Sequence, residues 1–257
     1  RDCGFEGSIV PGVPSALNAM LQSREIDVSP SSSFEYALNS HDYLLLPEYS
    51  ISSRGPVKSV LLFSPYAALN DLQGEQIAIT GESATSINLL RVLLLEFVGL
   101  TRVDDYVPDQ DVETLIKNKQ PALLIGNRAM QQADDLPDGM HCHDLGAIWY
   151  ELTGLPFVFA LWIVRRDSAE TMADKISALH TALGISLRRA FSNLEELAEQ
   201  TGAAKHEVSG LVNYWQTIDY SLTDQHIAGF ELFAELCVKH NLLKKSPDIE
   251  FFQPLLG

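Results

Sequence analysis

The stretch that decides the fold is Gln76 to Gly99, with the sequence QIAITGESATSINLLRVLLLEFVG. Its apolar residues Ile77 to Ile79 predict a short buried strand. Gly81 to Ser86 predict a turn into a long apolar helix, and Gly99 is a suitable residue to end that helix. A strand followed by a turn and a helix is the unit from which α/β proteins are built, so this segment predicts an α/β fold.

The turn in this segment has the composition of an anion site. The first amides of a helix have no partner inside the helix and carry partial positive charge, so they attract anions without a cationic side chain. Ser83, Ala84, Thr85 and Ser86 lie at this predicted helix start. Because a single turn of this kind is more often only a helix cap, the anion-site hypothesis needs a second turn that faces it.

A second turn with these properties lies upstream. Ile26 to Val28 predict a strand, and Ser32 and Ser33 then precede a predicted helix. Ser32 and Glu35 have capping-box spacing, which is the structural alternative for these serines. Ligands of open α/β sheets bind beyond the carboxyl ends of the strands, so two such turns predict one shared site.

The other predicted elements follow from local patterns. A polar connector, 47–56, separates predicted strands and contains Arg54, which we interpret either as a solvated loop residue or as a partner for a carboxylate. The unbroken apolar run Leu155 to Val164 predicts a strand buried on both faces. Further strands are predicted at 7–10, 43–46, 57–63 and 122–125. After Ser168 only helices are predicted: one at 169–183, one that starts at a cap on Ser192 and ends at Gly202, one at 205–218, and one that starts at a cap on Thr223.

Composition excludes several classes of protein. The chain of 257 residues is 46% hydrophobic and 20% charged, as in globular proteins, and its formal net charge is -16. This charge repels nucleic acid and anionic membranes, so we predict neither as a partner. Any small anionic ligand must therefore be held by amides, hydroxyls or a few local cations.

Cysteine usage and hydropathy predict a cytoplasmic protein. Cys3, Cys142 and Cys237 are odd in number and far apart, which favours free thiols in a reducing compartment. No apolar run is long enough for a membrane span, and Leu89 to Val98 is interrupted by Arg91 and Glu96. No signal peptide is recognisable, although a chain that begins at Arg1 does not test this point.

His141, Cys142, His143 and Asp144 bring metal-ligand side chains together in the sequence. On a strand His141 and His143 share one face while Cys142 points to the other, so three ligands do not converge and we predict no metal site. His143 or Asp144 at a strand end is a better candidate for contact with a substrate.

Three groups of segments carry a resemblance to a known family: VPSALN (13–18) with DVSPSSSFEY (27–36), SISSRGPVKSVLLFS (50–64) with GESATS (81–86), and Asp144-Leu145 with GLPFVFALW (154–162). Together they resemble the chorismate dehydratase family of the futalosine route to menaquinone. The similarity covers roughly residues 9–243. Members of the family usually begin with a strand that carries a Tyr-x-Asn motif at the cleft, and no residues here match that motif.

The resemblance implies a type II periplasmic-binding-protein-like fold, in which two hinged α/β lobes enclose a ligand cleft. We expect the first lobe to comprise residues 1–80 and 167–257, including the helical C-terminal part, and the second lobe to comprise residues 81–166. The residues expected to bind the substrate are Ser32, Ser33, Ser52, Ser53, Ser83, Ala84, Thr85, Ser86 and Asn127.

The implied reaction removes water from chorismate to give 3-[(1-carboxyvinyl)oxy]benzoate, without a cofactor. Because the ring becomes aromatic, the site must chiefly orient a dicarboxylate and stabilise developing charge. The candidate proton acceptors are His143, Asp144 and the substrate's own enolpyruvyl carboxylate. We favour the carboxylate, since no basic residue is clearly placed at either turn.

Two alternatives share the expected fold. A solute-binding protein for a small carboxylate would hold the same anion without catalysis, and the free thiols argue against it. The related enzyme that makes 1,4-dihydroxy-6-naphthoate should have a cleft that accommodates a nucleoside, and the quoted segments resemble it less. A purely structural interaction module leaves the paired hydroxyl turns without a role.

Overall fold

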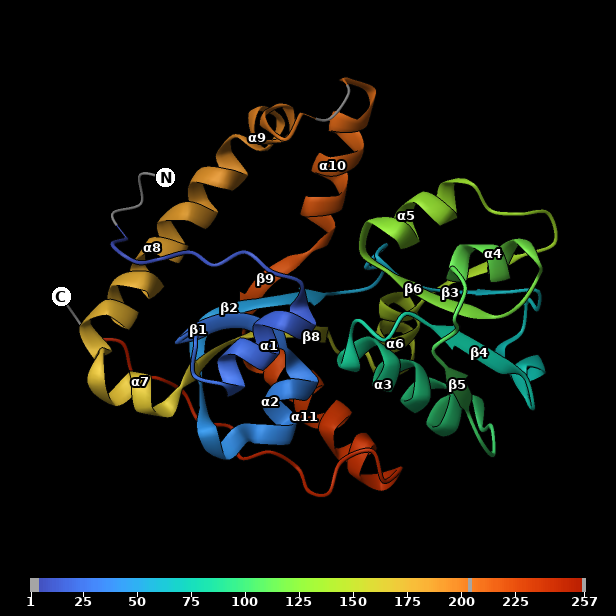
Figure 1. Ribbon diagram of the computed structural model, residues 1–257, viewed down its shortest axis with the longest axis horizontal. Helices are drawn as coiled ribbons and strands as arrows, with labels where there is room; N and C mark the ends of the chain where they lie inside the picture. Colours follow the sequence, from blue (N-terminus) through green and yellow to red (C-terminus); the bar gives the residue numbers. More distant parts are fainter. Residues whose placement is uncertain (1–4, 203–204, 256–257) are drawn as a thin grey trace.

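The computed structural model describes residues 5–202 and 205–255, and its two β-sheets lie side by side (Figure 1). Sheet A has four strands in the order β1-β8-β2-β9, and sheet B has five strands in the order β5-β4-β6-β3-β7. The strands are β1 (Val28–Ser32), β2 (Tyr43–Ser53), β3 (Val60–Ser64), β4 (Gln76–Ile79), β5 (Asp104–Tyr106), β6 (Ala122–Ile125), β7 (His141–Asp144), β8 (Phe157–Arg165) and β9 (Asp219–Leu222).

Helices cover both sheets, and most of the C-terminal part is helical (Figure 1). In the described part of the chain, no helix is both long and apolar enough to cross a membrane. The helices are α1 (Pro14–Gln22), α2 (Ser33–Asn39), η1 (Ser40–Asp42), η2 (Leu69–Leu72), α3 (Ala84–Val92), η3 (Leu93–Val98), α4 (Val112–Lys117), α5 (Gly126–Asp134), α6 (Leu145–Thr153), α7 (Arg166–Thr171), α8 (Ala173–Ser192), α9 (Leu194–Gln200), α10 (Lys205–Thr217) and α11 (Asp224–Lys239).

Sheet A is organised around β8. This strand pairs antiparallel with β1 on one side and with β2 on the other, so β1 and β2 run in the same direction. Its apolar residues are largely buried, as the sequence predicts. Phe157 at its start packs against Phe233 of α11, with ring centroids 5.0 Å apart. The carboxyl ends of β1 and β2 therefore lie at the edge of sheet A where β8 begins.

In sheet B, too, the carboxyl ends of several strands lie together at one end of the sheet. Strand β4 runs parallel to β5 and β6, whereas β3 runs antiparallel to β6 and β7. The carboxyl ends of β4, β6 and β7 therefore lie at a common edge. One buried hydrophobic cluster contains residues of both sheets, among them Ile163 of β8 and Ile77 of β4, so the core is continuous between the sheets.

The strand pairing favours lobe boundaries other than the expected ones. Strands β3 and β4 precede residue 81 but belong to sheet B, and β8 precedes residue 167 but belongs to sheet A. The chain passes from sheet A to sheet B in segment 54–59, and it returns in segment 154–156. The order of strands along the chain does not reveal which sheet each one joins, so we now propose lobe boundaries in these two crossing segments.

Several local predictions also differ from the structure. Residues 7–10 form no strand, and the predicted connector 47–56 is mostly part of β2, because β8 and β9 both pair with it. Ser192 does not cap α9, since its Oγ donates to carbonyls of α8 and Asn193 is the capping residue. Gly99 does end the helical segment after α3, with a φ of 80°, as predicted.

Candidate functional site

The two hydroxyl-rich turns meet in the structure. The Ser32 and Thr85 Oγ atoms are 2.7 Å apart, and the Ser33 Oγ lies 3.3 Å from Thr85 Oγ1. The backbone N–H of Phe34 also donates to Thr85 Oγ1, at 3.1 Å. Ser32, Ser33 and Thr85 are all buried. The start of α2, which follows sheet A, therefore directly contacts the start of α3, which follows sheet B.

Both turns also cap their own helices. Ser32 is the N-cap of α2, and its Oγ accepts from the Glu35 N–H at 3.3 Å. Ser83 is the N-cap of α3, and its Oγ accepts from the Ser86 N–H at 3.3 Å and lies 3.0 Å from Ser86 Oγ. Ser32 and Ser83 therefore cap their helices. The same hydrogen bonds hold in position the hydroxyls that face the opposite turn. Ala84 is the first residue of α3, so its amide is one of those without a helical partner.

Ser52 and Ser53 lie at the same edge of sheet A as Ser32. Ala160 of β8 pairs with Ser32 on one side and with Ile51 on the other, so the ends of β1 and β2 flank β8. Ser52 Oγ lies 2.6 Å from Ser50 Oγ. Ser53 Oγ is buried without a hydrogen-bond partner, and a Cβ at Gly146 would lie only 2.7 Å from it.

Asn127 is placed at the corresponding edge of sheet B. It is exposed and is the second residue of α5, which follows β6 directly. The next residue, Arg128, contacts the turn before α3, with its Nη1 atom 3.6 Å from Glu82 Oε1. Sequence reasoning missed Arg128, although a cation just after a strand end is a recognisable signal. The structure thus gathers the turn before α3, Asn127 and Asp144 at one edge.

Three arginines, Arg54, Arg91 and Arg128, form ion pairs in this part of the chain. Arg128 binds Glu113 through two hydrogen bonds of 2.7 Å, and this pairing raises the pKa of Arg128 and lowers that of Glu113. Arg91 of α3 binds Asp105 at 2.8 and 2.7 Å. Arg54 donates to Asp219 at 2.8 Å, so it is more than a solvated loop residue. An anion at the two turns would therefore be held mainly by amides and hydroxyls.

Asp144 connects sheet B to the first crossing segment. Its Oδ1 accepts from the N–H groups of Val57, at 3.1 Å, and Ala147, at 3.0 Å. Its Oδ2 accepts from the Lys58 N–H at 2.7 Å. The carboxylate therefore caps α6 and holds segment 54–59 at the same time, which favours a structural role over that of a proton acceptor.

Replacing Asp144 with alanine should lower the free energy of unfolding by about 2 to 4 kcal/mol, because three backbone donors lose a charged acceptor. Asp144→Asn keeps one carbonyl oxygen and should lose less. Denaturant unfolding of both variants measures the effect. Normal stability with abolished turnover in Asp144→Asn would instead indicate that this carboxylate transfers a proton.

His143 points away from the shared edge. Its Nε2 lies 3.1 Å from the carbonyl oxygen of Tyr66, which follows the other end of β3. Burial lowers the pKa of His143, although the bond to Tyr66 opposes this shift. The His141 and His143 rings share a face, with centroids 6.5 Å apart. Within residues 5–202 and 205–255, no three His, Cys, Asp or Glu side chains form a group that could hold a metal ion.

A second network lies beside Ser52, which pairs with Asp219 across β2 and β9. The fully buried His226 places its Nε2 3.1 Å from Asp219 Oδ2 and accepts at Nδ1 from the Thr223 N–H at 3.2 Å. This acceptor role requires an unprotonated Nδ1, so the imidazole is neutral. Burial lowers the pKa of His226, although the neighbouring Asp219 opposes this effect.

We expect stability to fall as the pH is lowered below about 6.5, the ordinary pKa of histidine. A histidine whose pKa is lowered in the folded state binds protons more readily when unfolded, so its contribution is complete above that pH and is lost below it. Unfolding measured at several pH values between 7.5 and 5 tests this effect. His226→Gln should show a shallower pH dependence, and an unchanged profile would contradict the assignment.

The chain matches a protein family described as menaquinone biosynthesis over residues 2–239. It is also 32% identical, over 243 residues, to the chorismate dehydratase of Thermus thermophilus, an alignment that covers 88% of this chain and 85% of that protein. These similarities confirm the resemblance identified from the quoted segments.

Solved structures show the fold. A protein from Archaeoglobus fulgidus aligns with a TM-score of 0.67 at 18% identity, over 91% of this chain and 86% of that one. A Candida albicans protein with the generic periplasmic binding protein fold aligns with a TM-score of 0.69 at 11% identity, over 98% and 88%. The aliphatic sulphonate binding protein of Escherichia coli gives a TM-score of 0.61 at 19% identity, over 96% and 82%. The predicted periplasmic-binding-protein-like fold is therefore confirmed, and the chain belongs to the menaquinone biosynthesis family.

Proposed function

We propose that this protein is a carbon–oxygen lyase that removes water from chorismate to give 3-[(1-carboxyvinyl)oxy]benzoate. The hydrogen at C3 and the hydroxyl group at C4 leave as water, and the ring becomes aromatic. The family match and the similarity to the Thermus chorismate dehydratase support this proposal. The single structural observation that carries it is the 2.7 Å contact between Ser32 and Thr85, which joins two helix starts from different sheets.

The two helix starts suit a substrate with two carboxylates. Hydroxyls that bond to one another in the structure can instead donate to carboxylate oxygens, and such charge-assisted bonds are stronger. We assign Ser83, Ala84, Thr85 and Ser86 to one carboxylate, and Ser32 and Ser33 to the other. Ser52, Ser53 and Asn127 flank these turns at the strand ends and would contact the rest of the substrate.

The enzyme offers few groups that could accept the proton. Asp144 is occupied by three backbone donors, and His143 binds the Tyr66 carbonyl away from the two turns. The substrate's enolpyruvyl carboxylate is covalently close to C3 and needs no enzyme group to position it. We therefore propose that this carboxylate accepts the proton while the two turns hold it in position.

Mass spectrometry of chorismate incubated with the purified protein tests the proposal. We expect chorismate to lose one water, at a rate that does not change when a chelator is added. Chorismate that binds without being consumed would place the chain with the solute-binding proteins. Neither binding nor consumption would refute both the substrate and the proposed site.

The thiols support a reducing compartment for this activity. Cys237 is free and buried, and burial raises its pKa to about 12, while Cys142 is free at the surface. Cys3 lies outside the described residues. We propose that the enzyme works in the cytoplasm. Measuring chorismate consumption in the soluble fraction of the cells tests this proposal.

A further inference from the structure

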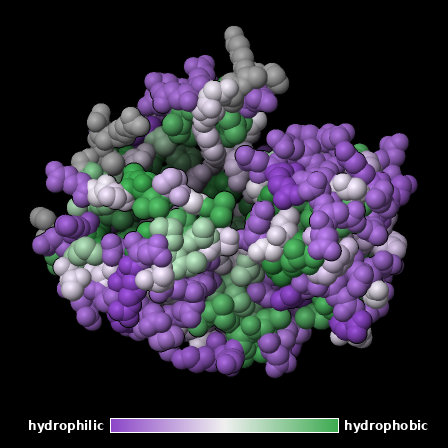
Figure 2. All heavy atoms as spheres, in the orientation of Figure 1, coloured by the Kyte–Doolittle hydropathy of each residue, from purple (hydrophilic) through white to green (hydrophobic). Residues whose placement is uncertain are grey.

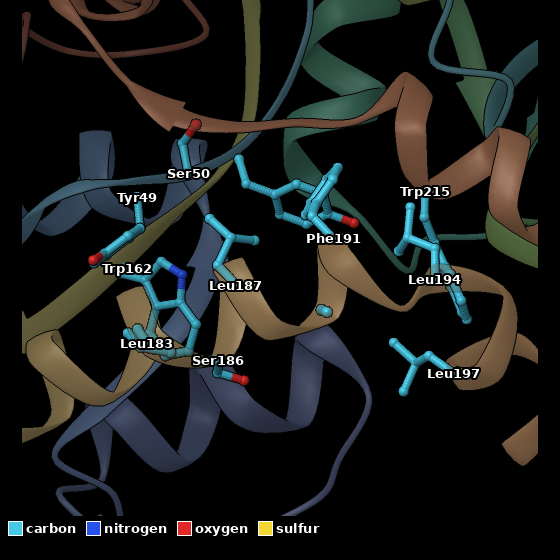
Figure 3. A pocket seen from close by; sticks show the side chains of 12 residues that line it. Tyr49, Ser50, Trp162, Leu183, Ser186, Leu187, Phe191, Leu194, Leu197 and Trp215 are labelled. Carbon is cyan, nitrogen blue, oxygen red and sulfur yellow. The ribbon is translucent and has the colours of Figure 1, made fainter. Parts of the chain in front are cut away.

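A concave surface lies away from the two turns. It is a hollow of about 270 Å³ enclosed by the face of sheet A and by helices α8, α9 and α10 (Figure 3). Figure 2 shows apolar residues gathered in this hollow, whereas much of the surrounding surface is hydrophilic. Its volume is slightly below the range that is typical of small-molecule sites, about 300 to 1,000 Å³, so only a small ligand would fit.

The lining of the hollow is aromatic on several sides. Trp162 comes from β8, Phe191 from α8, Trp215 from α10 and Tyr220 from β9. The rings of Phe191 and Tyr220 pack edge to face, with centroids 5.7 Å apart. Leu187 of α8 also lines the hollow (Figure 3). Aromatic walls of this kind favour flat apolar ligands, because rings stack or pack edge to face against them.

Charge distinguishes this hollow from the proposed substrate site. None of its twelve lining residues is an Asp, Glu, Lys, Arg or His, although the whole chain carries a net charge of -16. A dicarboxylate would lose its hydration there without gaining a cation, which is costly. An uncharged ligand avoids this cost and gains from contact with the apolar walls.

We propose that this hollow binds a small uncharged aromatic molecule that has either one ring or two fused rings. The hollow is linked to the proposed site through β2, since Ser50 lines the hollow and its Oγ lies 2.6 Å from Ser52 Oγ. The α10 wall is fixed to the first crossing segment, because the Tyr214 hydroxyl donates to Ser59 Oγ at 3.1 Å. The ligand would therefore lie against sheet A and beside a helix that is bonded to the segment between the two sheets.

Intrinsic fluorescence provides a direct test. The chain has three tryptophans, of which Trp162 and Trp215 line the hollow and Trp149 is buried in the core. The probe is 2,3-dimethyl-1,4-naphthoquinone, an uncharged two-ring quencher whose blocked ring positions do not add exposed thiols such as Cys142. Titration into the full chain should give saturable quenching, and anionic 2-naphthoate should bind at least about tenfold more weakly.

Matched variants of α8 locate the binding. Ala190→Phe fills the hollow and should weaken binding of the probe about tenfold or more, whereas Ala178→Phe places the same ring on an exposed part of the helix and should leave it unchanged. Ser186→Phe, also in the lining, is a second filled variant if Ala190→Phe does not fold. Chorismate consumption should be unchanged in all three, so this test is independent of the proposed function.

Three results would overturn the proposal. The first is the lack of saturable quenching, and the second is equal quenching in the filled and exposed variants. The third is a dimer, seen by light scattering, that the filled variants abolish, because the hollow would then be covered by a second copy of the chain.

Discussion

Replacing Thr85 with valine is expected to lower kcat/KM for chorismate by about 100-fold, a loss typical of removing one hydrogen-bond donor from a catalytic site. Valine has nearly the shape of threonine but lacks the hydroxyl that lies between Ser32, Ser33 and the Phe34 amide. The Phe34 N–H and the hydroxyls of Ser32 and Ser33 then lose their hydrogen-bond partner on α3. Steady-state consumption of chorismate measures the effect.

Thr85→Ser is the matched control, because it keeps the hydroxyl and removes only a methyl group. It should retain most of the activity. Thr85→Val should unfold at a somewhat lower denaturant concentration, because the buried Phe34 N–H loses its acceptor, so both variants are assayed where they are fully folded. Full activity in Thr85→Val would show that the contact between the two turns only joins the sheets. The proposed substrate site would then have to lie elsewhere.

The position of each turn at a helix start could be predicted from the sequence because its cause is local. Hydroxyl residues at Ser32 and Ser83 mark helix starts, and a helix start after a strand lies at the carboxyl edge of its sheet. Those rules do not depend on which strands pair. The predicted caps at Ser32 and Ser83 are confirmed for the same reason.

The partners of Asp144 and Arg54 could not be predicted in this way. Asp144 binds amides that are 86 and 87 residues away in the sequence, and Arg54 binds Asp219, 165 residues away. Such contacts depend on how the sheets are assembled, which no local pattern encodes. The extension of β2 into the predicted connector has the same cause, because pairing with β8 and β9 outweighs the turn propensity of its residues.

The sequence also did not predict which of the two sheets each strand joins. Val60 to Ser64 form a buried and largely apolar strand, as β8 does, and strands were predicted in both places. The short segments 54–59 and 154–156 lead the chain into sheet B and back into sheet A. Their conformation depends on contacts such as the Asp144 hydrogen bonds and the close approach of Gly229 to Pro156.

Gly229→Ala is expected to lower the free energy of unfolding by about 3 kcal/mol or more, the upper part of the range for overpacking a core. Gly229 is buried in α11, where a Cβ would lie 2.1 Å from the Pro156 carbonyl oxygen in the second crossing segment. Backbone atoms on both sides cannot rotate away, so α11 would have to move from the start of β8. Denaturant unfolding measures the loss.

Gly210→Ala is the same glycine-to-alanine change at a position where it should raise stability instead of lowering it. Gly210 lies within α10, and a Cβ there would meet nothing within 4 Å, so alanine should stabilise the protein by up to about 1 kcal/mol through its higher helix propensity. A difference in sign between the two variants would attribute the loss at Gly229 to its contact with Pro156. Equal and small effects would mean that α11 and the crossing segment are not packed as closely as the structure shows, and that the return of the chain to sheet A depends on other contacts.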